Sequence, residues 1–197
     1  MKSSLRYQAA RHGLGTLNAD DIKATIQALV DEGLYLDAFL EALDSDLHPR
    51  MAEVLPAFLA ALGHYHVIVP SREEAVWELI GYHLQNVASN HANALQELGK
   101  LVADVYWEYD FHTPTKNYLG DSHGIEHLIG LYWSADDMRE RPQEISVNGM
   151  RGEEAWSELN RQIVIEAKRW LLNQPSNPSI EGTVKGLRPS PAPHVKR

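Results

Sequence analysis

The sequence of 197 residues contains no cysteine, which excludes disulfide scaffolds, thiolate zinc sites and cysteine nucleophiles. Long apolar runs are missing as well. The longest, residues 54–62, is nine residues long and contains Pro56, about half of what a membrane span needs. The first residues of the chain hold no apolar stretch typical of a signal peptide. These absences predict a soluble cytoplasmic protein with no membrane association.

The composition is that of an ordinary globular chain. Hydrophobic residues make up 44% and charged residues 23% of the sequence, so a hydrophobic core can form. A chain of this length builds one domain more readily than two. The sequence has no internal repeat of fixed period, no Gly-x-Ser-x-Gly elbow of a serine hydrolase and no complete phosphate-binding loop.

The chain is strongly acidic once its C-terminal segment is considered separately. Residues 173–197 contain four Lys or Arg and one Glu, which is a net charge of +3. The whole sequence has a net charge of −9, so residues 1–172 carry a net charge of −12. A surface of this charge repels phosphate backbones, which argues against nucleic acid as a partner. It favours a basic protein surface or a cation instead.

Hydrophobic spacing predicts a mostly α fold. Apolar residues recur at intervals of three and four through most of residues 18–172, as in amphipathic helices. We predict a single-domain helical bundle of about six or seven helices, with at most one short strand or hairpin. An N-terminal helical subdomain over 16–63 and a main helical bundle over 71–172 are expected to pack together as one domain. Half of the ten prolines fall in residues 173–197, which predicts a disordered tail.

Several element boundaries have local signals. Ser71 and Glu74 have the spacing of a capping box, which predicts a helix start. Residues 89–93 predict a break between two antiparallel helices, because about 35 unbroken residues would be long for a globular domain. Pro56 is expected to kink its helix or to mark its start. Residues 145–149 indicate a tight turn between extended segments.

The sharpest candidate for chemistry is the segment His123-Gly-Ile-Glu-His127. Two histidines four residues apart lie on one face of a helix, where they can share a metal ion, and Glu126 can activate a bound water. On a helix that includes this motif, the three side chains point away from the apolar stripe and the main core. The motif therefore predicts His123 and His127 as metal ligands and Glu126 as the general base of a hydrolase.

The spacing resembles the His-x-x-Glu-His signature of the inverted zinc peptidases, and the similarity covers these five residues. The resemblance implies zinc as the metal and a further acidic ligand far downstream. This chain has no acid at that distance. The nearer candidates are Glu153, Glu154, Glu158 and Glu166.

A second pattern would complete a metal site. If the helix that carries Asp104 continues to His112, then Asp104, Glu108 and His112 share one face at intervals of four residues. Together with His123 they would form a mixed carboxylate–imidazole site for zinc, manganese or iron. The alternative is that Asp104 and Glu108 form a solvated face and His112 caps the turn before Pro114.

Aromatic and acidic side chains are interleaved in the same segment. A strictly amphipathic segment cannot bury all of its rings, so some are expected at the surface among carboxylates, where aromatics anchor and acids steer a basic partner. The alternative is an aromatic corner of the core with solvated acids around it. The residues that we predict to bind a partner are Asp104, Trp107, Glu108, Tyr109, Asp110, Tyr118 and Asp121.

These patterns support three functional hypotheses. The favoured one is an acidic cytoplasmic α-helical binding protein that docks on a basic protein partner and neutralises or regulates it, as an inhibitor or immunity protein does. The second is a metal-dependent hydrolase that uses the His-x-x-Glu-His site, with zinc, manganese or iron as cofactor. The third is a structural subunit of a larger assembly. No complete catalytic set is present, so the sequence leaves open whether the protein is an enzyme.

Overall fold

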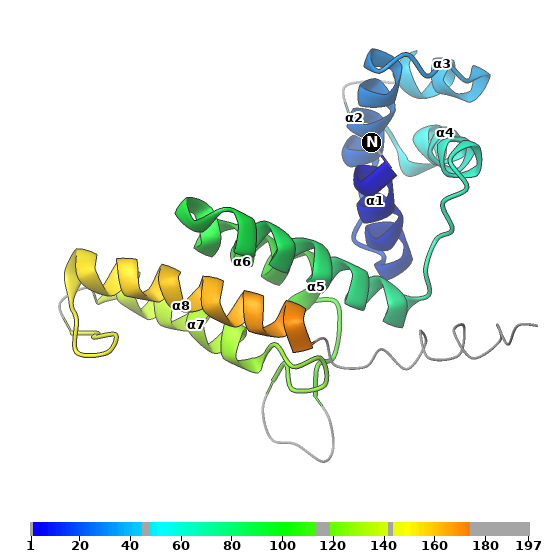
Figure 1. Cartoon of the computed structure of the whole chain (residues 1–197). Helices are drawn as coiled ribbons and strands as arrows, with labels where there is room; N and C mark the ends of the chain where they lie inside the picture. The colour runs from blue at the N-terminus through cyan, green and yellow to red at the C-terminus, as the bar shows by residue number, and fades with distance from the viewer. Residues whose placement is uncertain (1, 45–47, 113–118, 142–143, 174–197) are drawn as a thin grey trace, which may run out of the picture.

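The described part of the chain is mostly α-helical. The computed structural model describes residues 2–44, 48–112, 119–141 and 144–173. Among these residues no strand forms, and extended pairing is limited to an isolated bridge between Val147 and Met150. The predicted mostly α fold is confirmed. The described α-helices are α1 (Lys2–Leu14), α2 (Ala19–Asp31), α3 (Asp37–Asp44), α4 (Met51–His64), α5 (Arg72–Ser89), α6 (Ala94–Leu101), α7 (Glu126–Glu140) and α8 (Gly152–Asn173) (Figure 1).

The helices form two packed groups. Helices α2, α3 and α4 pack on one another, and α5 to α8 form the second group (Figure 1). Each group has its own cluster of buried apolar side chains, with Phe58 fully buried in the first and Leu84 in the second. Helix α1 joins the groups, because Leu5 belongs to the first cluster and Leu14 to the second. The predicted division into a subdomain over 16–63 and a bundle over 71–172 stays a prediction. Neither range includes α1.

Helix α1 was missed because its buried side is not purely apolar. Ala10 and Leu14 are fully buried. Tyr7 and Arg11 also turn inward, and both contact Asp104 of the segment after α6. Because polar side chains share the buried side, the sequence of α1 has no clear amphipathic period.

Most of the predicted element boundaries are present in the structure. The capping box at the start of α5 is present, with the Ser71 N–H donating to Glu74 Oε2 at 3.0 Å and the Glu74 N–H donating to Ser71 Oγ at 3.4 Å. The predicted break after α5 is a short 3₁₀ turn over His91–Asn93. Pro56 lies inside α4 and does not mark its start. The predicted tight turn is present, and Asn148 and Gly149 both adopt positive φ, at 51° and 80°.

The segment between α6 and α7 differs from the prediction. Helix α6 continues as one π-helical turn, Val102–Tyr106, and the chain leaves helical geometry before His112. The expected helix face shared by Asp104, Glu108 and His112 is therefore wrong. Helix α7 begins at Glu126, so His123 lies in the turn that precedes it. A π turn is rare and is frequently found at functional sites, which directs attention to Asp104 at its centre.

Two predictions fall outside the described part of the chain. These are the disordered tail predicted over 173–197, of which all but Asn173 at the end of α8 lies outside the described residues, and the partner-binding role of Tyr118. Within the described ranges, no helix is both long enough and apolar enough to cross a membrane.

Candidate functional site

The predicted site residues separate into three places. Trp107 lies on the surface, Asp104 lies in a polar cluster against α1 and α5, and His123 lies in a buried aromatic environment. The separation follows from the π turn and from the late start of α7, which point successive side chains in different directions. Each place is completed by residues from distant parts of the sequence.

The exposed place is an aromatic patch that consists of Tyr106, Trp107, Tyr132 and Trp133. Trp107 is 68% exposed and Trp133 is 38% exposed. Their ring centroids lie 6.4 Å apart at an interplanar angle of 71°, and Tyr106 contacts both rings edge-on, at 4.8 and 6.0 Å. Tyr132 contacts Trp133 in the same way, at 5.2 Å. Edge-to-face contacts of this kind are favourable and fix the rings relative to one another.

Acidic side chains flank the aromatic patch. Glu108 and Asp110 are exposed and follow Trp107 in the chain. On α7, Asp136 and Asp137 are exposed and lie one turn beyond Trp133. Each of these two has an arginine of the same helix end within 4 Å, at 3.9 and 3.4 Å. Exposed pairs of this kind add little stability, but the two arginines offset the charge of Asp136 and Asp137 locally. Among the described residues, Glu108 and Asp110 are the acids beside the patch that have no such arginine.

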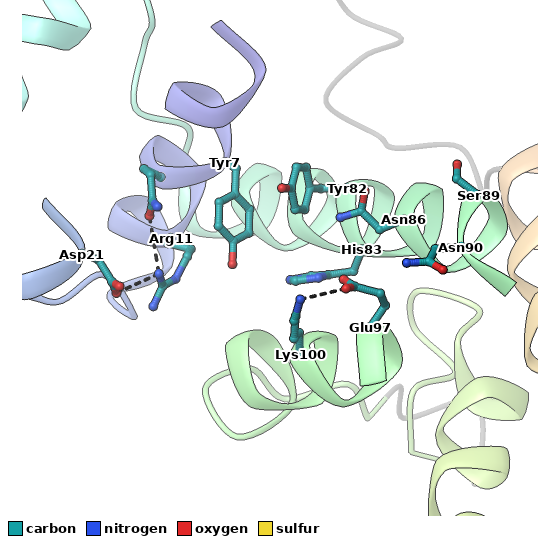
Figure 2. A pocket seen from close by; sticks show the side chains of 11 residues that line it. Tyr7, Arg11, Asp21, Tyr82, His83, Asn86, Ser89, Asn90, Glu97 and Lys100 are labelled. Atoms are coloured by element: carbon teal, nitrogen blue, oxygen red, sulfur yellow. Dashed lines mark hydrogen bonds and ion pairs between the residues drawn. The ribbon is translucent and has the colours of Figure 1, made fainter. Parts of the chain in front are cut away.

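The second place is the Asp104 cluster, formed by Tyr7, Arg11, His83 and Asp104 from α1, α5 and the π turn. Asp104 Oδ2 accepts hydrogen bonds from the Tyr7 hydroxyl and, at 2.9 Å, from His83 Nε2. The Nε of Arg11 lies 3.6 Å from Asp104 Oδ1. Figure 2 shows Tyr7 and Arg11 on α1 facing the side of α5 that carries His83. A partner contact by the Asp104 carboxylate would require these internal bonds to break.

The ionisation of the cluster follows from its burial and hydrogen bonds. Burial raises the pKa of the Asp104 carboxyl, but the hydrogen bonds from His83 and Tyr7 and the charge of Arg11 outweigh it, so the pKa is below its ordinary value. Burial and the hydrogen bond to Asp104 raise the pKa of the Tyr7 hydroxyl. Near neutral pH the carboxylate is therefore charged and the phenol protonated, which is the pairing that the hydrogen bond requires.

The third place surrounds His123, which is 2% exposed. The expectation that this side chain points away from the core is wrong. Its Nδ1 lies 2.9 Å from Ser122 Oγ, and its Nε2 lies 3.4 Å from Glu73 Oε1 at the start of α5. Three aromatic side chains pack against the imidazole with centroid distances of 4.4 to 5.2 Å, and they are Trp77, Tyr109 and Phe111.

Tyr109 and Asp121, which were also predicted to bind a partner, are not exposed. The Tyr109 hydroxyl donates to Glu73, and burial, followed by this hydrogen bond, raises the pKa of Tyr109 to about 12. Asp121 is 3% exposed. Of the predicted set, Trp107, Glu108 and Asp110 are therefore the described residues with exposed side chains.

The metal-site residues are not gathered around one point. His112 and His127 are exposed, whereas His123 is buried. Glu126 is the first residue of α7, and its Oε2 is buried without a hydrogen-bond partner in the described structure. Across the described ranges, no group of three or more His, Asp or Glu side chains could hold a metal ion. The metal site stays a prediction without a ligand set to support it.

The residues that sequence reasoning missed come from other helices. Tyr7 and Arg11 lie in the helix that was not predicted, and Trp133 lies on α7, outside the segment in which exposed rings were predicted. His83 had a usable signal: it stands on the buried side of α5, three residues after Ile80 and four before Val87. A lone polar residue in a buried stripe requires a polar partner, but the sequence does not say that the partner is Asp104.

The buried imidazole gives a pH-dependent prediction. Burial disfavours the charged ring more than nearby Glu73 favours it, so the pKa of His123 lies below its ordinary value of 6.5. As the pH falls below 6.5, the unfolded chain binds this proton first, and the contribution of His123 then destabilises the folded state. A histidine NMR titration measures the midpoint directly. A midpoint at or above 6.5 would contradict the prediction.

The comparisons with known proteins give no relative from which to infer a function. No family model, no curated protein and no solved structure matches this chain. Function is therefore argued from the side chains that the fold brings together.

Proposed function

We propose that this chain is an acidic α-helical binding protein that docks on a basic protein partner through the aromatic patch and neutralises or regulates that partner. The observation that carries the proposal is the exposed pair Trp107 and Trp133 in edge-to-face contact. Tryptophan, with tyrosine and arginine, is enriched among the side chains that dominate binding free energy at interfaces. An exposed pair therefore has a large free energy to gain from burial by a partner.

The patch is held in position before any partner binds. Tyr106 is half-buried, packs against the core of the second helix group and contacts both tryptophans. Rings fixed in this way lose little conformational entropy on association, which favours affinity. The two tryptophans come from the end of the π turn and from α7, so the packing of these elements sets the shape of the patch.

Charge indicates what kind of partner suits the patch. Residues 1–172 carry a net charge of −12, and exposed carboxylates of Glu108, Asp110, Asp136 and Asp137 flank the aromatic rings in sequence or on the same helix. Such a field attracts a positively charged surface and repels an acidic one. Arginine suits this surface especially well, because its guanidinium group stacks on tryptophan rings and pairs with carboxylates.

Affinity purification with a Trp107→Ala/Trp133→Ala variant tests the proposal. We expect the wild-type chain to retain a basic protein from the lysate of its source cells, identified by mass spectrometry. Purified, this partner should bind the double variant at least about 30-fold more weakly, because truncating one dominant interface residue removes about 2 kcal/mol or more. Raising the salt concentration from about 0.05 to about 0.5 M should weaken wild-type binding as well.

The control is a Tyr35→Ala/Leu40→Ala variant. Tyr35 lies two residues before α3 and is 75% exposed, and Leu40 lies within α3 and is 73% exposed. Both are open hydrophobic side chains that do not belong to the patch. This variant should bind as the wild type does. Retention of no basic protein, or equal binding by the Trp107→Ala/Trp133→Ala variant, would refute the proposal, provided that thermal unfolding shows both variants to be folded.

A further inference from the structure

A polar cavity of about 620 Å³ lies beside the Asp104 cluster. Side chains from α1, α5 and α6 line most of it, and Figure 2 shows them converging from these three helices. The volume falls within the range of about 300 to 1,000 Å³ that is usual for small-molecule sites. None of the four aromatic-patch residues lines the cavity, so an inference about it is independent of the proposed partner surface.

The charged groups of the cavity are already compensated by one another. Arg11 pairs with Asp21 at 2.8 Å and lies 3.6 Å from Asp104, and Lys100 pairs with Glu97 at 2.7 Å. Figure 2 shows the Arg11–Asp21 pair beside α1 and the Lys100–Glu97 pair on α6. An anionic or cationic ligand would have to compete with one of these internal partners. A neutral ligand would leave both pairs intact.

The uncharged polar groups of the lining, by contrast, are available. Within the described part of the chain, the side-chain amides of Asn86 and Asn90 and the hydroxyl of Tyr82 have no hydrogen-bond partner, although all three residues line the cavity. Asn86 lies in the last turn of α5, and Asn90 is the residue that caps the C-terminal end of this helix, so the two amides line the cavity from the same end of α5. Tyr82 stacks one ring face on Tyr7, with centroids 4.3 Å apart.

His83 provides a second, independent indication of a ligand. It lines the cavity, is 1% exposed and uses Nε2 to bond to Asp104. Because a carboxylate accepts, Nε2 must donate, and Nδ1 of the neutral ring is left as an acceptor. Nδ1 is buried and has no hydrogen-bond partner among the described residues. A buried acceptor without a donor is destabilising, and a ligand hydroxyl would satisfy it.

We propose that this cavity binds a neutral polyhydroxylated small molecule of sugar type. Asn86 and Asn90 would donate to and accept from its hydroxyl groups, and Tyr82 would add its hydroxyl. His83, held by Asp104, accepts from a hydroxyl that reaches the inner wall. The ligand is expected to be neutral because the charged groups of the cavity already pair with one another. It is expected to carry several hydroxyl groups because the amides, the phenol and the imidazole nitrogen that line the cavity have no hydrogen-bond partner among the described residues.

Three pyranoses of the same size test the class of ligand: D-glucose, D-glucuronate and D-glucosamine. Side-chain amide NMR signals of Asn86 and Asn90 are followed during titration of the full chain at neutral pH. We expect D-glucose to shift both signals saturably, with a dissociation constant of roughly 1 mM. The anionic and cationic sugars should bind at least about fivefold more weakly. Absence of a saturable shift with D-glucose, or tighter binding of either charged sugar, overturns the proposal.

Matched variants test the position of the site. Asn86→Leu and Asn90→Leu should each weaken D-glucose binding about tenfold, measured by the ligand's own saturation-transfer signal. Gln85→Leu replaces an exposed amide of the same helix that does not line the cavity, and it should bind as the wild type does. Because Asn90 is exposed, its replacement keeps the test valid if Asn86→Leu fails to fold. Unchanged binding by a folded Asn86→Leu or Asn90→Leu chain overturns the proposal.

Discussion

Asp104→Ala is expected to lower the free energy of unfolding by roughly 3 kcal/mol. The substitution removes the shared acceptor of Tyr7 and His83 and an ionic partner of Arg11. His83 is 1% exposed, so water cannot readily replace the lost acceptor, and a buried donor without a partner is strongly destabilising. For a chain of this size the melting temperature should fall by about 6 to 12 °C, measured by calorimetry or circular dichroism.

Asp136→Ala is the matched control for this effect. Its side chain is 53% exposed, and its arginine partner on the same helix lies 3.9 Å away. Exposed pairs of this kind contribute little, so the change in stability should stay within about 0.5 kcal/mol. Similar decreases in the free energy of unfolding for Asp104→Ala and Asp136→Ala would show that the Asp104 cluster does not stabilise the packing of α1 and α5 against the π turn.

Gly13→Ala is expected to destabilise the protein by about 1 to 3 kcal/mol, although helix propensity alone predicts a gain of about 1 kcal/mol. Gly13 lies near the end of α1, and a Cβ at this position would come within 2.5 Å of the Pro70 backbone oxygen and 3.4 Å of Ala75 Cβ. The first contact is with backbone, so it cannot be relieved by rotating a side chain. Denaturant unfolding of the variant and the wild type measures the difference.

Gly130→Ala separates propensity from packing. Gly130 lies in the interior of α7, and a Cβ there would meet nothing within 4 Å. The substitution should therefore stabilise the protein by up to about 1 kcal/mol, as propensity predicts. Stabilisation by Gly13→Ala as well would mean that α1 does not approach the start of α5 as closely as the structure has it.

Local sequence signals were sufficient wherever one segment determines its own conformation. The hydroxyl of Ser71 and the carboxylate of Glu74 satisfy backbone N–H groups within four residues, so the start of α5 was predictable. Asn148 and Gly149 tolerate positive φ, and the predicted turn is present at these positions. Such interactions do not depend on the rest of the fold.

The candidate sites were predictable in part. An exposed ring among acids at Trp107 was expected, because one segment held too many aromatics to bury. Its neighbour Trp133 was not, because its pairing with Trp107 depends on how α7 packs beside the π turn. The prediction of continuous helix through residues 104–112 and from residue 123 onward was wrong. His112 and His123 lie outside helices, so helical spacing does not describe where their side chains point.

The sequence by itself determined a mostly helical, acidic chain, the start of α5 and the region that holds exposed aromatic rings. These properties depend on composition and on interactions between residues that are near one another in the chain. Only the tertiary structure decided that Tyr7, Arg11 and His83 meet Asp104, and that Glu73 faces His123. The physical reason is that a polar side chain withdrawn from water, such as that of His83, requires a polar partner. No local pattern specifies which of many distant candidates the packed helices will supply.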